Sequence, residues 1–149
     1  MLQLNGVEWS TGRASLSIGA EVNHLSMSTA MWCCFNGLPP VLAFVDTGCT
    51  LSIAGGEWAA LLCDQLGMSI GTSTLSTRLG SFDGNIYRCP IRLVTEQGKH
   101  ANFDANLLLA PEWPGPPVLG YTNALDRVRI AFDPGVVPGC AYVYFGVAR

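Results

Sequence analysis

The sequence predicts a single, mainly β domain with two short helices. Short runs rich in β-branched and aromatic residues recur along the chain, and turn-forming Gly, Pro and Asn residues separate them. Only residues 57–66 and 123–128 have a helix-like pattern of apolar side chains. At 149 residues the chain has the length of one ordinary domain, so no second domain is needed to account for it.

The first expected strands lead to a hairpin. Residues 14–18 alternate polar and apolar side chains, as in a strand with one buried face. Residues 27–35 and 41–45 are β-like runs, and Asn36-Gly37 between them favours a tight reversal of the chain. This hairpin would present the residue after its second strand at one end of the sheet.

A helix and a long hairpin are expected next. Residues 50–53 continue extended, and residues 57–66 repeat apolar side chains at helical spacing before Gly67, which favours a helix end. Residues 72–93 read as a long hairpin. Its glycine-rich segment 80–85 surrounds an aromatic residue, so we expect this segment to be an exposed, mobile tip.

The remaining segments predict three further strands. Residues 101–109 favour a strand that enters the core, and a proline-rich loop follows at residues 110–117. After the helix-like residues 123–128, strands are expected at residues 129–132 and 141–145, with turn chemistry between them.

A carboxylate directly follows the expected strand 41–45. Asp46 is placed by an apolar, β-favouring run, and a strand seldom delivers a charge from its interior without a role for it. Thr47 supplies a hydroxyl that can hold neighbouring backbone groups, and Gly48 lets the backbone turn sharply. The three residues predict a rigid turn around one carboxylate.

Two motifs carry a resemblance to a known family. Asp46-Thr47-Gly48 after an apolar strand resembles the active-site triplet of the retropepsin-like aspartic proteases. Later in the chain, Val118-Leu119-Gly120-Tyr121 resembles the family's motif of two hydrophobic residues and a glycine, through which the active-site strand threads. The similarity covers about residues 30–146. It implies a retropepsin-like acid protease β-barrel over residues 1–149, with residues 1–26 as an N-terminal extension atypical of the family.

The resemblance also implies an activity. An aspartic endopeptidase needs two carboxylates that share one proton, and this chain has one triplet, so we expect a homodimer with one Asp46 from each protomer. Thr47 and Gly48 would fix the turn, no cofactor would take part, and the partners would be a second copy and a polypeptide substrate. Residues 141–145 are the expected dimer contact, because terminal strands pair across the twofold axis in this family.

The family's flap, which covers the substrate, corresponds to residues 80–85. The candidate substrate-binding residues of the flap and groove are Gly80, Ser81, Phe82, Asp83, Gly84, Asn85, Val118, Leu119 and Gly120. Ile53 is a further candidate for the groove. Cys49 departs from the family, which commonly has alanine or serine after the triplet, and a thiol is a weaker hydrogen-bond donor than a hydroxyl.

Two other functions remain open. The fold could serve as a catalytically silent module that binds peptides or supports assembly, and such a module would hold peptides without releasing fragments. Alternatively, Asp46 to Thr50 could be the D-x-G-x-T phosphate loop of the sugar kinase and actin-like fold. Those proteins are much longer and need a second, nucleotide-binding lobe, so the aspartic protease is the preferred prediction.

Composition argues against several partners. The formal net charge is −3, the isoelectric point is near 5.2, and Lys99 is the only lysine, so nucleic acid is not an expected partner. No apolar run is long enough to cross a membrane, and we expect no membrane partner. His24 and His100 are isolated, so no metal site is expected. Hydrophobic residues are 49% of the chain and charged residues 13%, which favours an oligomer or an apolar groove.

The cysteines and the N-terminus bear on localisation. Six cysteines occur without a CxxC pair, which favours free thiols in a reducing compartment over a disulfide framework. The first twelve residues lack the basic region and apolar stretch of a secretory signal. We therefore expect a cytoplasmic protein.

Overall fold

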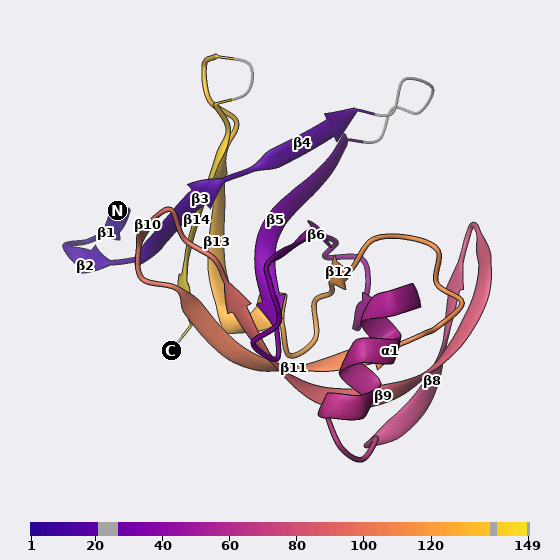
Figure 1. The fold of residues 1–149 in the computed structure, drawn as a ribbon. Helices are drawn as coiled ribbons and strands as arrows, with labels where there is room; N and C mark the ends of the chain where they lie inside the picture. The colour runs from indigo at the N-terminus through magenta and orange to yellow at the C-terminus, as the bar shows by residue number, and fades with distance from the viewer. Residues whose placement is uncertain (21–26, 138–139, 149) are drawn as a thin grey trace.

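The computed structural model describes residues 1–20, 27–137 and 140–148, and they form two main sheets, a small two-stranded sheet and two short helices (Figure 1). The larger sheet closes into a barrel because β5 pairs with β9 at its far side. In ring order, the barrel strands are β5 (Met27–Phe35), β6 (Val41–Val45), β12 (Val118–Leu119), β7 (Ser52–Ala54), β11 (Ala101–Leu109) and β9 (Gly80–Leu93). The prediction of a mainly β barrel is confirmed.

Two more strands extend the barrel sheet. β4 (Ser17–Ala20) pairs with β5, and β8 (Gly71–Thr77) pairs with β9. The predicted strand 14–18 is therefore two strands, with a break at Leu16, whose amide donates to the carbonyl of Ala141 at 2.9 Å. The predicted strands 27–35, 41–45 and 101–109 are confirmed as β5, β6 and β11.

The second sheet combines strands from the N-terminal and C-terminal parts of the chain. Its order is β10 (Gln97–Gly98), β3 (Gly12–Ser15), β14 (Tyr142–Val147) and β13 (Val128–Asp133). β13 and β14 form a hairpin that projects from the barrel (Figure 1). A separate small hairpin, β1 (Gln3–Leu4) with β2 (Val7–Glu8), precedes this sheet in the chain.

The two helices are short, as predicted. α1 (Gly56–Gln65) lies against the outside of the barrel, where Ala59 and Leu62 are buried (Figure 1). η1 (Leu125–Arg127) is a single 3-10 turn, shorter than the expected helix 123–128. Within the described residues, neither helix has the length and apolar character required to span a bilayer.

Alternate side chains along β9 and β11 are buried and fill the barrel. Tyr87, Cys89, Ile91 and Leu93 are buried, whereas the residues between them are exposed. This period of two is what a strand with one covered face requires. The largest fully buried side chains are Phe35, Phe145, Met31, Ile53, Leu62, Ile91, Leu93, Leu107, Leu108, Leu119, Val143 and Cys33.

The prediction that residues 80–85 form the tip of the hairpin is wrong. In the register of β8 with β9, Thr77 lies opposite Gly80, so the turn consists of Arg78 and Leu79. Residues 80–85 belong to the first half of β9. The second glycine of that segment, Gly84, is explained by close approach: a Cβ there would overlap the carbonyl of Leu109 on the neighbouring strand β11.

The predicted dimer contact at residues 141–145 is also not available as a strand edge. β14 pairs with β13 on one side and with β3 on the other. Val143 and Phe145 are fully buried in the core of the protomer. Among the described residues, the open edges of this sheet belong to β10 and β13.

Candidate active site

Asp46 stands at the first position after β6. Its amide donates to the carbonyl of Leu119 at 3.0 Å, which continues the parallel pairing of β6 with β12 by one residue. The backbone of Asp46 is therefore fixed by the sheet, whereas its side chain emerges from the sheet end and is exposed in the protomer. This is the place that the sequence predicted for the carboxylate.

The turn after Asp46 orients the carboxylate. The amide of Gly48 donates to Asp46 Oδ1 at 2.8 Å, and the amide of Cys49 donates to the carbonyl of Asp46 at 3.2 Å. A fixed N–H donor limits the rotation of a carboxylate. Thr47, in the same turn, is exposed as well.

β12 and the residue after it support the turn from below. β12 inserts between β6, with which it is parallel, and β7, with which it is antiparallel. At Gly120 a Cβ would overlap the carbonyl of Leu51, so only glycine fits between the two chain segments. The amide of Tyr121 then donates to the carbonyl of Cys49 at 2.8 Å, which ties the turn to this support.

A buried serine completes the support, and the sequence analysis missed it. Ser52 is fully buried on β7, and its Oγ accepts a hydrogen bond from the amide of Gly120 at 3.1 Å. The available signal was a hydroxyl within the apolar run Leu51 to Ala54, because a buried polar group needs a partner.

Cys49 lies directly beside the candidate site. Its thiol donates to the carbonyl of Leu51 at 3.1 Å. Partial burial, and secondly the charge of Asp46, raise the pKa of this thiol. Cys49 is therefore a neutral thiol at physiological pH and offers Asp46 no second charge.

A cavity of about 400 Å³ opens beside the turn. It is lined by residues 48–51, by residues 73–76 of β8 and by Leu108. The walls combine hydroxyl groups with leucine side chains, as is common in sites that hold a mixed polar and apolar ligand. Ser73, Thr74, Leu75 and Ser76 are thus candidate site residues that the sequence analysis did not name.

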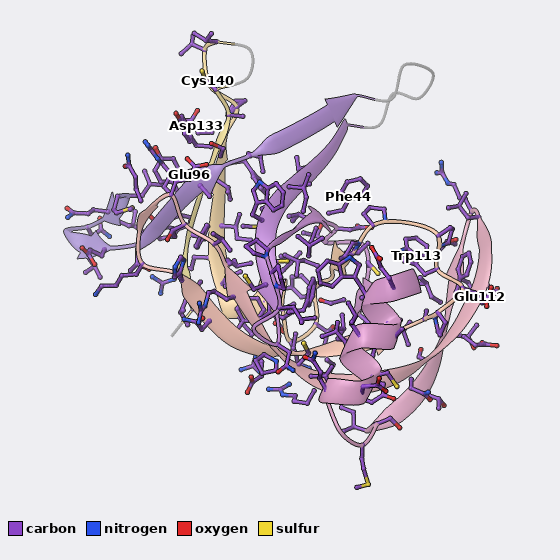
Figure 2. All side chains as sticks on the ribbon, viewed as in Figure 1. Phe44, Glu96, Glu112, Trp113, Asp133 and Cys140 are labelled. Atoms are coloured by element: carbon purple, nitrogen blue, oxygen red, sulfur yellow. The ribbon has the colours of Figure 1, made fainter. Side chains whose placement is uncertain are left out.

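The predicted flap residues form the β9 arm of the hairpin, from Gly80 beside the turn to Asn85 near the base. The ring of Phe82 meets that of Trp113 edge to face, with centroids 5.4 Å apart and planes at 89°. Trp113 lies on the loop that follows β11 (Figure 2), and its Nε1 donates to the carbonyl of Pro116 at 2.9 Å. Asp83 accepts a hydrogen bond from Thr74 at 2.5 Å across the two arms. The segment 80–85 therefore anchors the hairpin.

The predicted groove residues lie close to Asp46 in the fold, but they are buried. Val118, Leu119 and Gly120 lie directly below Asp46, as the motif predicted. They are buried, however, and so is Ile53, so they cannot line an open groove in the protomer. Packing between β6 and β7 explains this burial, since a central strand has neighbours on both edges.

The other candidate residues stay apart from the site. Among the described residues, no group of three or more His, Cys, Asp or Glu side chains could hold a metal ion. His100 Nδ1 accepts a hydrogen bond from the amide of Thr95 at 3.0 Å, and His24 lies outside the described residues. A separate cavity of about 300 Å³ lies over the sheet where residues of β5, β9 and β11 meet, lined by Arg92, Asn102 and Asp104 among others, and no predicted site residue lines it.

Fold and site together define a mainly β barrel that presents one carboxylate on a turn supported by a threaded strand. No protein-family model matches the sequence, and no curated protein matches it. Among solved structures, the solution structure of Simian Foamy Virus (mac) protease is similar, with a TM-score of 0.42 and 21% sequence identity. The match covers 63% of this chain and 89% of that chain.

Proposed function

We propose that this chain is one protomer of a homodimeric aspartic endopeptidase, which hydrolyses peptide bonds in extended polypeptides. The observation that carries the proposal is the turn at Asp46. An exposed carboxylate is held by the amide of Gly48 at 2.8 Å, and the sheet beneath it is locked by Gly120 and Ser52. Such rigidity is expected of a catalytic group, whose position must be fixed before substrate binds.

The chemistry uses two Asp46 side chains that share one proton. The ionised carboxylate takes a proton from a water, whose oxygen bonds to the scissile carbonyl carbon, while the other carboxyl gives its proton to the carbonyl oxygen. The resulting diol then returns a proton to the second carboxylate as the C–N bond breaks. The first carboxyl passes its proton to the leaving nitrogen, so both groups end in their starting states.

A second protomer is needed because one chain presents only half of this pair. The exposure of Asp46 and Thr47 supports this point, since both side chains are free to meet a partner surface. The cavity beside the turn would accept a substrate side chain between residues 48–51 and β8. The part of the chain that the structure describes forms a mainly β barrel without the nucleotide-binding second lobe that the phosphate-loop alternative requires.

Mass spectrometry of a peptide library incubated with the purified protein tests the proposal. We expect internal cleavage products from the wild type and none from Asp46→Asn, whose amide has nearly the same shape but cannot act as a base. Peptides that are retained by the protein and recovered intact would contradict an enzyme and support the peptide-binding alternative. Equal cleavage by both proteins would remove Asp46 from the mechanism.

A further inference from the structure

We propose that the open edge of β13 pairs antiparallel with the same edge of a second copy, about a twofold axis at Ala131. This inference rests on the proposed function, which requires a homodimer, and it names the surface that forms it. The resulting contact would join the two four-stranded sheets into one continuous sheet.

β13 has an unpaired edge that is suited to such a contact. Among the described residues, its only strand partner is β14. The backbone amides and carbonyls along its other edge therefore have no strand to pair with. Phe132 is 48% exposed on this strand, although Ile130 on the same face packs against the core. An unpaired edge with an exposed aromatic side chain is a template for another strand.

Symmetry and hydrogen bonding restrict the register. In an antiparallel pair, two opposed residues must point their backbone groups in the same way, either both toward the partner or both away. When the two strands are identical copies, the numbers of two opposed residues must therefore be both odd or both even. A register centred on Ala131 satisfies this rule and pairs residues 129–133 with residues 133–129 of the second copy.

The side chains of β13 are self-complementary in this register. Arg129 comes to lie opposite Asp133 of the second copy, and the twofold axis makes this pair twice. On the other face, Ile130 comes to lie opposite Phe132, which covers the exposed ring. Opposite charges and apolar groups directly across a strand pair are both stabilising arrangements.

The two charged groups are available for this pairing. The ion pair that the described residues form is between Arg127 and Asp126, and Arg129 takes no part in it. Asp133 is exposed and uses Oδ1 to accept a hydrogen bond from the amide of Gly135 at 3.0 Å, which leaves the second oxygen free. Figure 2 shows Asp133 on the projecting hairpin of β13 and β14.

The other open edges fit a second copy less well. β1, β2 and β10 have two residues each, which is too short for a stable pairing, and β4 has four residues without a charged side chain that could form complementary pairs. β8 contains no charged residue and forms one arm of the hairpin beside the candidate site, so pairing there would restrict access to the cavity. By contrast, β13 begins directly after η1, which starts from the Gly120 support: the amide of Leu125 donates to the carbonyl of Gly120 at 3.1 Å. The β13 edge is thus connected to the support of the site through η1.

Charge exchange tests the register. Sedimentation equilibrium would measure the dimer dissociation constant for the wild type, Arg129→Asp, Asp133→Arg and an equimolar mixture of the two variants. Each variant alone places like charges opposite each other twice, so we expect its dimer to weaken at least about tenfold.

In a mixed dimer of the two variants, the introduced carboxylate lies opposite the introduced guanidinium, and the unchanged Asp133 of one chain lies opposite the unchanged Arg129 of the other. The mixed dimer should therefore recover wild-type affinity. Arg78→Asp makes the same change in net charge as Arg129→Asp, but at the hairpin tip, and should leave the dissociation constant unchanged.

A second variant, at another position, tests the interface even if Asp133→Arg does not fold. Phe132→Glu alters an exposed position, and it should weaken the dimer at least about tenfold because the new charge lies opposite Ile130. Circular dichroism would confirm that each variant is folded. A wild type that stays monomeric at every concentration, or a dimer that none of these variants weakens, would overturn the inference. A dimer of this kind that cleaves no peptide would overturn only the proposed function, and undiminished cleavage by monomeric Arg129→Asp would overturn the shared site.

Discussion

The hydroxyl of Ser52 accepts a hydrogen bond from the amide of Gly120 at 3.1 Å in the interior of the protein, and this contact joins β7 to the support beneath Asp46. Two segments far apart in the sequence thereby hold one turn in place. The position of the carboxylate depends on this buried pair as much as on the Asp-Thr-Gly triplet itself.

Ser52→Ala should destabilise the protein by about 1–3 kcal/mol, because the buried amide of Gly120 then has no acceptor. Urea unfolding followed by circular dichroism measures this loss. Ser69→Ala, at an exposed loop position, is the matched control and should change the stability by less than about 0.5 kcal/mol. Equal stabilities for the two variants would show that the hydrogen bond contributes nothing.

Asp46→Asn protein should inhibit the wild type in mixtures. With a ninefold excess of the variant and free exchange of subunits, only about a tenth of the wild-type chains remain paired with each other. Peptide cleavage per wild-type chain should fall by about the same factor. The same excess of Asp64→Asn, an exposed change on α1, should raise total cleavage because every mixed dimer keeps both Asp46 carboxylates. Cleavage that is indifferent to the Asp46→Asn protein would point to a complete site within one chain.

Alkaline pH should destabilise the fold through its buried thiols. Burial raises the pKa of Cys89 to about 12 and also raises the pKa of Cys33 far above that of an exposed thiol. The folded chain therefore keeps protons that the unfolded chain loses above about pH 9. This contribution to stability is complete below about pH 9 and is lost as the pH rises toward 12, by up to about 1.4 kcal/mol per pH unit for each thiol.

Urea unfolding at pH 8 and pH 10 checks this dependence. Cys89→Ala should reduce the difference in stability between the two pH values, because one of the two titrating thiols is gone. Cys140→Ala, at an exposed position, should leave the difference as in the wild type. If Cys89→Ala and the wild type lose the same stability between the two pH values, the thiol is not responsible.

Phe82→Leu should loosen the hairpin of β8 and β9. An edge-to-face contact of this kind contributes about 0.5–1.5 kcal/mol, so its loss should increase local opening about 2–10-fold. Trypsin cleavage after Arg78 in the turn reports this opening, and its rate should rise by the same factor. Phe44→Leu is the control, since Phe44 belongs to the same apolar cluster but not to the ring pair. An unchanged rate for Phe82→Leu would show that Trp113 does not anchor the hairpin.

The sequence predicted the parts of the fold that local chemistry determines. The hairpin of β5 and β6 was predictable because Asn36-Gly37 favours a tight turn between two β-like runs. α1 was predictable because its apolar side chains recur at helical spacing. Asp46 was predictable as an unusual carboxylate because it ends an apolar strand, and the structure places it at the end of β6.

What the sequence did not predict depends on contacts between distant segments. Gly80 and Gly84 both read as turn residues, but Gly84 is required by the close approach of Leu109 on the paired strand β11, which no local pattern reveals. The pairing of β14 on both edges depends on β3, more than a hundred residues earlier in the chain. Val118 and Leu119 were expected at a groove, and the neighbouring strands β6 and β7 bury them instead.

The two-residue strand β12 also determines when the turn at Asp46 can form during synthesis. β6 and β7 are complete early, but the amide of Asp46 has no acceptor until Leu119 exists, and the turn has no support until Gly120 and Tyr121 follow. At about 5–20 residues per second, several seconds of translation separate these events. A ribosome-bound chain therefore carries an unsupported turn at Asp46. This turn should become ordered abruptly once β12 inserts between β6 and β7. Late insertion of a short strand with distant partners is a slow step in folding.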